Sequence, residues 1–338
     1  MLHEHEYHPL EVIDVVDETA DTRSFVLDIP SELTETFAYA AGQFCTFRAT
    51  IDGESVVRCY SMSSSPDTDR LFVTTVKRVV GGLMSNWMID TLSPGDTIEV
   101  IRPSGLFVLR ESDVPIVAFA GGSGITPVIS IIKSALATTT RQITLVYANR
   151  AADSVIFAGA IERLRAASDG RLTVHHHLDE ERGFLDAAQC AALVGDRAGA
   201  DFYICGPGPY MDTVEAGLAT LDVAPTQVFI ERFVMPADVG TIEEVTPAES
   251  LVIRLAGQKH TLDYQAGDTI LETARRAGLA TPFSCEQGNC GTCMAHLDEG
   301  SVSMRANNVL SSAEVDDGWV LTCQGIPTSP EVTVDYDA

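Results

Sequence analysis

Basic side chains are scarce in this chain of 338 residues. Lys and Arg together number 22 against 48 Asp and Glu, which gives a formal net charge of −26. Phosphate backbones and anionic lipids repel a protein of this charge, so the composition argues against nucleic-acid binding and docking on a membrane. An acidic surface keeps a protein soluble, and it can also steer a basic partner. The composition leaves these two explanations open.

Long hydrophobic runs are also missing. The opening residues, Met1–His8, are polar and do not form the apolar core of a secretory signal. The longest apolar stretch, Val114–Ala137, is interrupted by glycines and by Pro127. This pattern predicts a buried strand, a loop and a helix rather than a membrane span. We therefore expect a cytoplasmic protein without a membrane segment.

Four of the eight cysteines have a spacing typical of a metal cluster. Cys285, Cys290 and Cys293 lie close together and are followed by a distant Cys323, which is the ligand pattern of a plant-type [2Fe–2S] cluster. Glycines in this loop, such as Gly288, let the backbone turn tightly and aim N–H groups at the sulfurs. Zinc sites favour two C-x2-C pairs, and only one is present here. Zinc and disulfides remain alternatives, but a cluster that moves single electrons is favoured.

The other cysteines and the histidines give weaker signals. Cys45, Cys59 and Cys190 have no pairing pattern, and we expect buried free thiols in a reducing compartment. His175–His177 continue a strand-like run, in which adjacent side chains point to opposite faces. We therefore expect no metal at these histidines.

The distribution of strand and helix signals predicts a multi-domain protein. Residues 1–108 contain short β-rich runs separated by turn residues, which predicts an antiparallel β-barrel. In residues 109–235 strands alternate with helices, as in a parallel α/β sheet. Residues 236–250 are polar and contain two prolines, which is typical of a linker. Residues 251–338 hold a strand pair, a helix and the cysteine loop, which we assign to an α+β domain.

A glycine-rich loop at Ala120–Pro127 joins the first predicted parallel strand to an apolar helix. Its glycines allow close approach of the backbone to a phosphate, and the helix N-terminus supplies N–H groups and a positive dipole. We expect Thr126 to be the N-cap and Pro127 to lie in the first turn. The third glycine of the usual dinucleotide fingerprint is replaced by Pro127, so a tight structural turn is the alternative.

Three further segments contain residues suited to a nucleotide. Arg58-Cys-Tyr-Ser61 places an Arg that can bind a phosphate two residues from a Tyr that can stack on a flat ring. Lys77–Ser85 contains a glycine pair before a predicted helix. Cys205–Met211 is a second Gly/Pro turn after a strand. Taken singly, the first two have ordinary explanations as a charged strand end and a hairpin turn.

In this order, the motifs of residues 8–337 resemble the ferredoxin–NADP reductase-like superfamily, in its subgroup with a C-terminal plant-type ferredoxin domain. The similarity is strongest to reductase components of bacterial oxygenases, especially those of 3-ketosteroid 9α-hydroxylase and phenylacetyl-CoA epoxidase. The resemblance implies FAD in the barrel domain, a pyridine nucleotide in the α/β domain, and a β-grasp domain that binds [2Fe–2S] through Cys285, Cys290, Cys293 and Cys323.

The resemblance also implies roles for individual residues. Arg58 would hold the flavin pyrophosphate, Tyr60 would pack on the isoalloxazine, and Ser61 would hydrogen bond near N5. The flavin phosphates would lie on Gly82, Leu83, Met84 and Ser85, with Val76 and Lys77 along the ribityl chain and ring edge. The nucleotide would bind Gly121, Gly122, Gly124, Thr126, Pro127 and Gly206, and Cys205, Glu231 and Phe233 would lie near hydride transfer. The implied catalytic set is Ser61, Thr126, Cys205 and Glu231.

By this resemblance the protein is a monomeric oxidoreductase that passes electrons from NADH through FAD and [2Fe–2S] to a terminal oxygenase. The implied partner is a Rieske-type steroid (3-ketosteroid 9α-) hydroxylase. Phenylacetyl-CoA epoxidase and an aromatic-ring oxygenase are alternatives, and so is a non-catalytic electron-transfer subunit of another flavoenzyme. The long gap between Cys293 and Cys323 argues against that subunit. NADH is expected over NADPH, because Arg150 is the only basic residue in the segment directly after the second parallel strand, and Asp153 in the same segment would repel a phosphate.

Overall fold

The computed structural model describes residues 7–233, 250–286, 288, 290–307, 309–310 and 312–338. The described residues fold into two compact units: the larger contains residues 7–103 and 107–233, and the smaller contains residues 104–106 and the described residues from 250 onward. The predicted linker 236–250 lies outside the described residues except for Ser250. No helix in the described ranges is long and apolar enough to cross a membrane.

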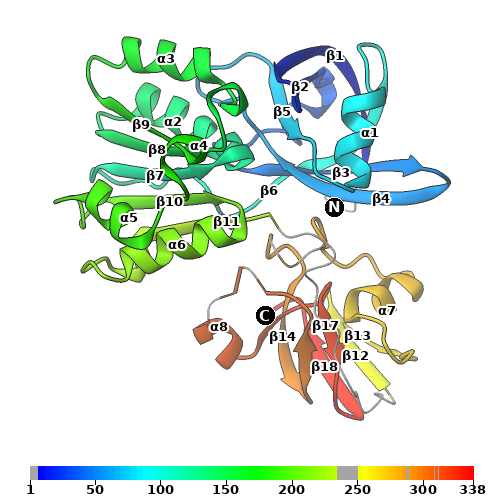
Figure 1. Ribbon diagram of the computed structural model, residues 1–338. Coiled ribbons are helices and arrows are strands. Elements are labelled where there is room, and N and C mark those ends of the chain that lie inside the picture. The colour runs from blue at the N-terminus through cyan, green and yellow to red at the C-terminus, as the bar shows by residue number, and fades with distance from the viewer. Residues whose placement is uncertain (1–6, 234–249, 287, 289, 308, 311) are drawn as a thin grey trace. The chain divides into compact units, whose positions relative to one another are not determined.

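The first part of the larger unit is an antiparallel sheet of six strands in the order β4-β3-β6-β1-β2-β5 (Figure 1). A bridge between Met62, just after β4, and Thr74 in β5 brings the two edges together, so the sheet curls towards a barrel. The strands are β1 (His8–Thr19), β2 (Thr22–Leu27), β3 (Phe44–Ile51), β4 (Glu54–Ser61), β5 (Phe72–Lys77) and β6 (Thr97–Ser104).

The interior of this sheet is filled by alternate side chains of its strands and by one face of α1 (Leu83–Thr91). Phe25 and Phe47 lie in the core, and Met84 and Met88 of α1 pack against them. A short 3-10 turn, η1 (Ser31–Leu33), follows β2. The burial of one face of α1 fixes its N-terminus beside the sheet, which matters for the site described below.

The second part of the larger unit is a parallel α/β fold. Its sheet has the order β11-β10-β7-β8-β9. Its strands are β7 (Ile116–Gly121), β8 (Ile143–Asn149), β9 (Leu172–Leu178), β10 (Asp201–Gly206) and β11 (Val228–Arg232). Its α-helices are α2 (Ile125–Thr138), α3 (Ala158–Ala167), α4 (Asp179–Arg182), α5 (Ala187–Val194) and α6 (Gly208–Leu218). Its 3-10 turns are η2 (Gly122–Gly124), η3 (Ala152–Ser154) and η4 (Pro225–Gln227).

Helices cover both faces of this parallel sheet (Figure 1). Alternate residues of β7 show why: Ala118 packs towards α2 and α3, whereas Val117 and Phe119 pack towards α5 and α6. The strand order reverses between β7 and β10, which follow one another in space but not in sequence. Ligands of open α/β sheets bind at such a switch point, beyond the carboxyl ends of the strands.

The smaller unit is an α+β fold. Its main sheet has the order β13-β12-β18-β14-β16, and β15 pairs with β17. The elements are β12 (Ser250–Leu255), β13 (Gln258–Leu262), α7 (Ile270–Arg276), β14 (Met294–Glu299), β15 (Val302–Met304), α8 (Ser312–Asp316), β16 (Trp319–Leu321), β17 (Gly325–Pro327) and β18 (Glu331–Asp335).

A capping box starts α7. Thr269 Oγ1 accepts from Glu272 N at 3.1 Å, and Thr269 N donates to Glu272 Oε2 at 2.7 Å. Ile270 and Ala274 then pack on Leu251 and Ile253 of β12. The predicted combination of antiparallel, parallel and α+β parts is therefore confirmed by the fold.

Candidate cofactor-binding sites

Strand β4 ends in the first candidate site. The Tyr60 ring packs edge-on against Phe47 of β3, with 5.6 Å between ring centroids, and burial raises the pKa of its hydroxyl. Ser61 is buried, and its hydroxyl finds no hydrogen-bond partner among the described residues. Buried hydroxyls are nearly always paired in folded proteins, so this one is suited to a bound molecule.

Two cationic side chains lie near this strand end. Arg58 is partly buried, and its Nη1 donates to the Val57 carbonyl at 2.6 Å. Lys77, at the end of β5, lies 3.7 Å from Asp21 through Nζ and Oδ2. Its neighbour Val76 is fully buried in the core of the sheet. The sheet therefore offers a buried hydroxyl, an aromatic ring and two cations from the ends of β4 and β5.

The N-terminus of α1 forms a cradle beside these strands. Gly82 is the N-cap, and within the described structure no side chain caps the helix and no acidic residue occupies its first turn. The N–H groups of Leu83, Met84 and Ser85 cannot bond within the helix, so they are available to an anion. Ser85 is buried, and its hydroxyl accepts from Val79 N at 3.2 Å. A Cβ at Gly82 would lie 2.6 Å from that hydroxyl, so only glycine fits.

The glycine loop after β7 is the second candidate site. Gly122 has φ of +51°, and a Cβ at Gly124 would overlap the Cys205 carbonyl oxygen. The loop therefore passes directly against the end of β10, at the switch point of the sheet. Gly121 also lies close to Tyr210, since a Cβ there would lie 2.9 Å from its ring. These contacts fix the loop beside the second Gly/Pro turn.

The expected N-cap of α2 is wrong. The helix begins at Ile125 with Gly124 as its N-cap, because the 3-10 turn of residues 122–124 continues directly into it. Thr126 lies inside the first turn and is buried, and its hydroxyl donates to Ser123 O at 3.0 Å. Pro127 does lie in the first turn, where its missing N–H costs no helical bond.

The ends of β10 and β11 lie beside the glycine loop. Cys205 is opposite Ala120 of β7 and Glu231 of β11. Burial raises the pKa of the Cys205 thiol well above its ordinary value, and the nearby Glu231 carboxylate raises it further. The thiol is therefore neutral at physiological pH. Gly206 follows, and a Cβ there would lie 3.1 Å from Gly121 Cα. Phe233, after β11, is exposed.

A cavity of about 540 Å³ lies beside the glycine loop and extends to Lys77 at the end of β5. Lys77 lines it from the antiparallel sheet, and Gly121 and Gly122 line it from the glycine loop. This volume is in the range of cofactor sites. The walls include Tyr210, whose buried hydroxyl has no hydrogen-bond partner among the described residues. The cavity thus contacts three of the sequence motifs: the Lys77–Ser85 segment, the glycine loop and the Cys205–Met211 turn.

Sequence reasoning missed several residues of this cavity. Tyr210, Asn149 and Asp179 all line it. Asp179 follows β9, and Glu180 N donates to the Arg150 carbonyl at 3.0 Å, which holds the start of α4 beside the end of β8. Asp153, the acidic residue that we expected here, is exposed and does not line the cavity. The signal that could have found Asp179 is its position at the carboxyl end of the third parallel strand.

The third candidate site is the cysteine loop of the smaller unit. Cys285, Cys290, Cys293 and Cys323 are all buried free thiols. A hydrogen bond to Cys285 raises the pKa of the Cys290 thiol, and one to Cys293 does the same for Cys323. The Cys290 thiol therefore lies near Cys285, and the Cys323 thiol lies near both Cys293 and Cys285. Among the described residues, no three His, Cys, Asp or Glu side chains gather as they would around a single metal ion.

One backbone donor, one side-chain donor and a required glycine complete the cysteine loop. Thr292 N donates to Cys290 Sγ at 3.4 Å, and Gln324 Nε2 donates to Cys323 Sγ at 3.7 Å. Gly288 has φ of +76°, and a Cβ there would lie 2.8 Å from the Ala306 carbonyl oxygen. Four buried thiols in the C-x4-C-x2-C…C spacing, with N–H groups aimed at two of the sulfurs, fit a [2Fe–2S] cluster. They fit zinc less well, because zinc sites favour two C-x2-C pairs and this set contains one.

Comparison with protein families assigns all three regions. Residues 9–109 match the oxidoreductase FAD-binding domain, residues 119–216 the oxidoreductase NAD-binding domain, and residues 253–328 the 2Fe-2S iron-sulfur cluster binding domain. The chain is therefore an oxidoreductase that uses FAD, NAD and a [2Fe–2S] cluster in electron transfer.

Individual relatives extend over the whole chain. The ferredoxin reductase component of 3-ketosteroid-9-alpha-monooxygenase from Rhodococcus rhodochrous is 39% identical over 97% of this chain and 96% of its own length. A component of 1,2-phenylacetyl-CoA epoxidase from Escherichia coli is 32% identical over 98% of both chains. The solved structure of phthalate dioxygenase reductase has a TM-score of 0.63 and 25% identity over 97% of this chain and 98% of that one. The chain belongs to the family of flavin-dependent iron–sulfur reductases that includes the 3-ketosteroid-9-alpha-monooxygenase reductase component.

Proposed function

We propose that this protein is the NADH-dependent reductase of a terminal oxygenase. The observation that carries the proposal is that one chain contains FAD-binding, NAD-binding and 2Fe-2S domains and matches oxygenase reductases over almost its full length. NADH releases two electrons as a hydride, the cluster accepts one at a time, and FAD can exchange electrons in both ways. Because FAD can accept two electrons and release one at a time, electrons pass from NADH to FAD and then to the cluster.

The end of β4 and the start of α1 are assigned to the flavin. Arg58 would neutralise the pyrophosphate, Tyr60 would pack on the ring system, and Ser61 would donate its unpaired hydroxyl near N5. The first-turn N–H groups of α1, with Gly82, Leu83, Met84 and Ser85, would bind phosphate oxygens. Val76 and Lys77 would border the ribityl chain and the ring edge.

The glycine loop and the ends of β10 and β11 are assigned to the nicotinamide nucleotide. Gly121, Gly122 and Gly124 would let the backbone approach the pyrophosphate, while Thr126 and Pro127 fix the first turn of α2. Cys205, Gly206, Glu231 and Phe233 would surround the transfer point. Since the Cys205 thiol is neutral, its role would be to pack against and orient the nicotinamide rather than to attack it.

The same cavity supports a preference for NADH over NADPH. A 2′-phosphate needs basic partners. Among the described residues, two basic side chains line the cavity, and of these Lys77 is assigned to the flavin, which leaves Arg150. Asp179, on the same wall, would repel that phosphate or accept from a ribose hydroxyl. We expect Asp179→Asn to raise kcat/KM for NADPH relative to NADH, and Asp153→Asn to leave the ratio unchanged. A tenfold or larger preference of the wild type for NADPH would overturn the assignment.

For the partner we propose a Rieske-type 3-ketosteroid 9α-hydroxylase. Relatives named as reductases of that monooxygenase are 39–41% identical to this chain, whereas the epoxidase component is 32% identical. All eight cysteines are free, which suits a reducing cytoplasm. We further propose that the reductase acts as a monomer and binds the oxygenase transiently.

Reconstitution tests this choice of partner. The purified holoprotein is mixed with NADH, substrate and either a 3-ketosteroid 9α-oxygenase or the oxygenase components of phenylacetyl-CoA epoxidase. We expect hydroxylated steroid to form in proportion to NADH consumed, and little epoxide. Coupled turnover with the epoxidase alone would move the assignment to that pathway. Turnover with neither would refute both partners while leaving the reductase chemistry measurable with artificial acceptors.

A further inference from the structure

Helix α2 has a polar face that the cofactor sites do not use. Its sequence is mostly apolar, yet Ser130, Lys133 and Ser134 lie three and four residues apart and therefore share one face. Ser130 and Ser134 are fully buried. Burying hydroxyl groups and an ammonium group costs free energy unless partners satisfy them. The partners come from the antiparallel sheet.

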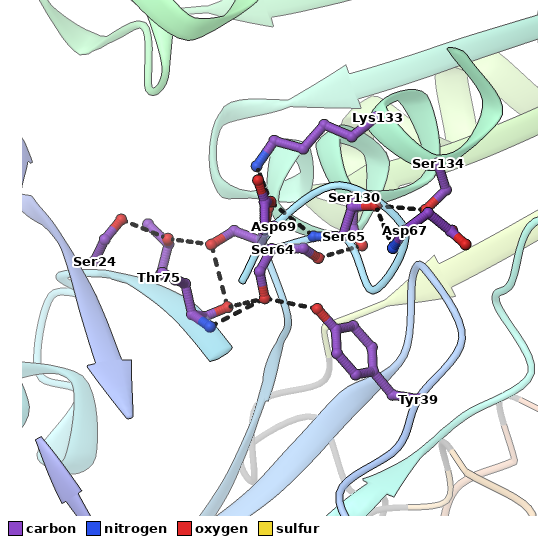
Figure 2. Close-up of polar contacts among 12 residues, drawn as sticks. Ser24, Tyr39, Ser64, Ser65, Asp67, Asp69, Thr75, Ser130, Lys133 and Ser134 are labelled. Carbon is purple, nitrogen blue, oxygen red and sulfur yellow. Dashed lines mark hydrogen bonds and ion pairs between the residues drawn. The ribbon is translucent and has the colours of Figure 1, made fainter. Parts of the chain in front are cut away.

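The segment that receives these side chains is the 62–71 loop, which joins β4 to β5 (Figure 2). Ser130 Oγ donates to the Ser64 carbonyl at 2.6 Å, and Ser134 Oγ lies 2.7 Å from Ser65 Oγ. Lys133 Nζ donates to the Ser63 carbonyl at 3.0 Å. Three side chains from one helix face thus bond to three consecutive residues of the loop.

An ion pair between Lys133 and Asp69 also links α2 to the 62–71 loop. Lys133 Nζ lies 2.8 Å from Asp69 Oδ2, and their side chains are 21% and 32% exposed. The same Asp69 oxygen accepts from Ser65 N at 2.9 Å, and Asp69 N donates to Ser65 O at 2.9 Å. One carboxylate oxygen therefore holds the turn of the loop and the helix together. We call Ser64, Ser65, Asp69, Ser130, Lys133 and Ser134 the loop–helix joint.

The joint is anchored on the side of the sheet as well. Ser64 Oγ accepts from Val73 N at 3.0 Å and lies 2.7 Å from the Tyr39 hydroxyl (Figure 2). Ser63 Oγ lies 2.7 Å from Thr75 Oγ1 of β5. The loop therefore has a fixed position on the sheet, and α2 is bonded to a rigid partner rather than to a loose turn.

The two segments that form the joint, the 62–71 loop and α2, are each adjacent in sequence to one of the two proposed cofactor sites. The loop begins after Ser61, the last residue of β4, and α2 begins after Gly124 and contains Thr126 in its first turn. Ser130 follows Thr126 by about one helical turn. An apolar contact could hold helix and sheet together with equal strength. Directional hydrogen bonds also fix the sliding and rotation of one element against the other.

We propose that the loop–helix joint is a positioning device for hydride transfer, with Lys133 and Asp69 as its principal residues. This inference rests on the proposed placement of flavin at Ser61 and nucleotide at Thr126. The joint sets the offset between the two sites, and hydride transfer falls steeply when the reacting groups are displaced by a fraction of an ångström to an ångström. The joint residues would act through this placement and would not touch either cofactor.

The test is Lys133→Met in the full-length holoprotein, which keeps the length of the side chain and removes its charge. We expect flavin reduction by NADH in stopped flow to slow by roughly tenfold to hundredfold. The KM for NADH and the FAD content should stay within twofold, since neither site loses a contact. Hydrogen exchange of the 62–71 loop should become faster, which gives a readout independent of turnover.

Two further variants serve as a second test of the ion pair and as a control. Asp69→Asn changes one atom of the same ion pair and should reproduce both effects, which keeps the test decisive if Lys133→Met folds poorly. Arg165→Met removes an exposed ion pair with Glu162 on α3 at the same 2.8 Å separation, and it should change neither rate nor loop exchange.

Faster loop exchange with an unchanged reduction rate would show that the joint is only structural and would overturn the proposal. Unchanged exchange and rate in both Lys133→Met and Asp69→Asn would overturn it as well. If NADH fails to reduce the flavin of the wild type, the proposed function falls and the positioning role falls with it.

Discussion

Single cysteines occur in two chemical settings in this protein. Cys290 belongs to the clustered thiols of the cysteine loop, whereas Cys59 lies in β4, where its sulfur is 3.4 Å from Thr46 Oγ1. Because [2Fe–2S] needs all four thiolates, Cys290→Ser should lower iron and labile sulfide from about two each per chain to near zero. Delivery to one-electron acceptors should then stop, while flavin reduction by NADH persists in the other unit.

Cys59→Ser is the matched control, since it makes the same substitution at a partly buried thiol outside the cluster loop. It should keep full iron and sulfide content. Metal analysis and an acid-labile sulfide assay measure the outcome. Stoichiometric zinc without sulfide in the wild type would contradict the cluster assignment.

Arg58 gives a second prediction at this scale. A charge-assisted hydrogen bond to phosphate contributes about 1.5–3 kcal/mol, so Arg58→Ala should weaken FAD binding by roughly tenfold to hundredfold. Arg48→Ala is the control, because Arg48 in neighbouring β3 is already paired with Glu99 at 2.8 Å. Fluorescence of released flavin on dilution measures both. Retention of FAD by Arg58→Ala as tight as in wild type would refute its phosphate role.

Residues were predictable from sequence where chemistry is concentrated in short segments. The spacing of the four cluster cysteines and of the glycines in the glycine loop is visible in the sequence itself. These residues could therefore be identified as site residues before the fold was known. Asp179 was missed, because it lines the same cavity as the glycine loop only through the order of the parallel strands. Its position directly after the third parallel strand, rather than after the second like Asp153, was the signal that could have found it.

At the scale of elements, the β7–α2 and β10–α6 turns depend on each other. Gly124→Ala would place a Cβ against the Cys205 carbonyl. Because the contact is with backbone atoms, no side chain can rotate to relieve it. Such overpacking costs about 1–3 kcal/mol, and it should also raise the KM for NADH. Urea unfolding and steady-state kinetics measure the two effects.

Gly208→Ala is the control for this steric effect. Gly208 lies in the neighbouring turn at the start of α6, and none of the described heavy atoms lies within 4 Å of a Cβ placed there. Its free energy of unfolding should change by less than about 0.5 kcal/mol. Equal losses in both variants would show that the Gly124 contact is not what limits substitution.

His296 couples β14 to the turn before β16. Its Nδ1 lies 2.9 Å from Asp298 Oδ1 and its Nε2 lies 2.9 Å from the Asp317 carbonyl, so both nitrogens face acceptors and the imidazolium is favoured. The Asp298 hydrogen bond, the Asp317 carbonyl and both carboxylates raise the pKa of His296 above its ordinary 6.5. Arg254 shares the Asp298 carboxylate at 2.7 Å, and the Trp319 ring packs against the imidazole.

The sign of the pH effect follows from this raised pKa. Folding favours the protonated form, so the stabilisation is complete below pH 6.5 and is lost as pH rises through the folded-state pKa. The unfolding midpoint of the smaller unit should fall over that range, and His296→Gln should flatten the dependence. Cluster absorbance during thermal unfolding reports it. A midpoint of the wild type that rises with pH over this window would contradict the prediction.

Elements with a strong local pattern were predictable, and their neighbours were not. The strand, loop and helix predicted within Val114–Ala137 correspond to β7, the 3-10 turn η2 and α2. The start of α2 was misplaced, because the glycines that suggested a loop before Thr126 form a 3-10 turn that leads into the helix. The partners of Ser130 and Lys133 lie in the 62–71 loop between two strands of the other sheet, so a polar helix face alone could not reveal them.

At the scale of the whole molecule, the net charge of −26 sets the response to salt. Attraction of a basic protein acceptor weakens as ions screen it, with a screening length of about 8–10 Å at physiological salt. The rate of cytochrome c reduction should therefore fall with ionic strength. Reduction of ferricyanide, an anion, should rise or stay level. A cytochrome c rate that is independent of salt would show that charge does not steer acceptors.

The sheet of the smaller unit has a consequence for biosynthesis. Its centre is β18, residues 331–335, which pairs in parallel with β12 and antiparallel with β14. All four cluster cysteines are translated before this strand. While the chain is still on the ribosome, the larger unit can fold, but the smaller sheet lacks its middle strand and exposes unpaired edges. We therefore expect the cluster to be inserted after translation has passed Asp335, when β18 can complete the sheet. In that case the topology of the sheet, rather than the supply of metal, decides that folding comes before cluster insertion.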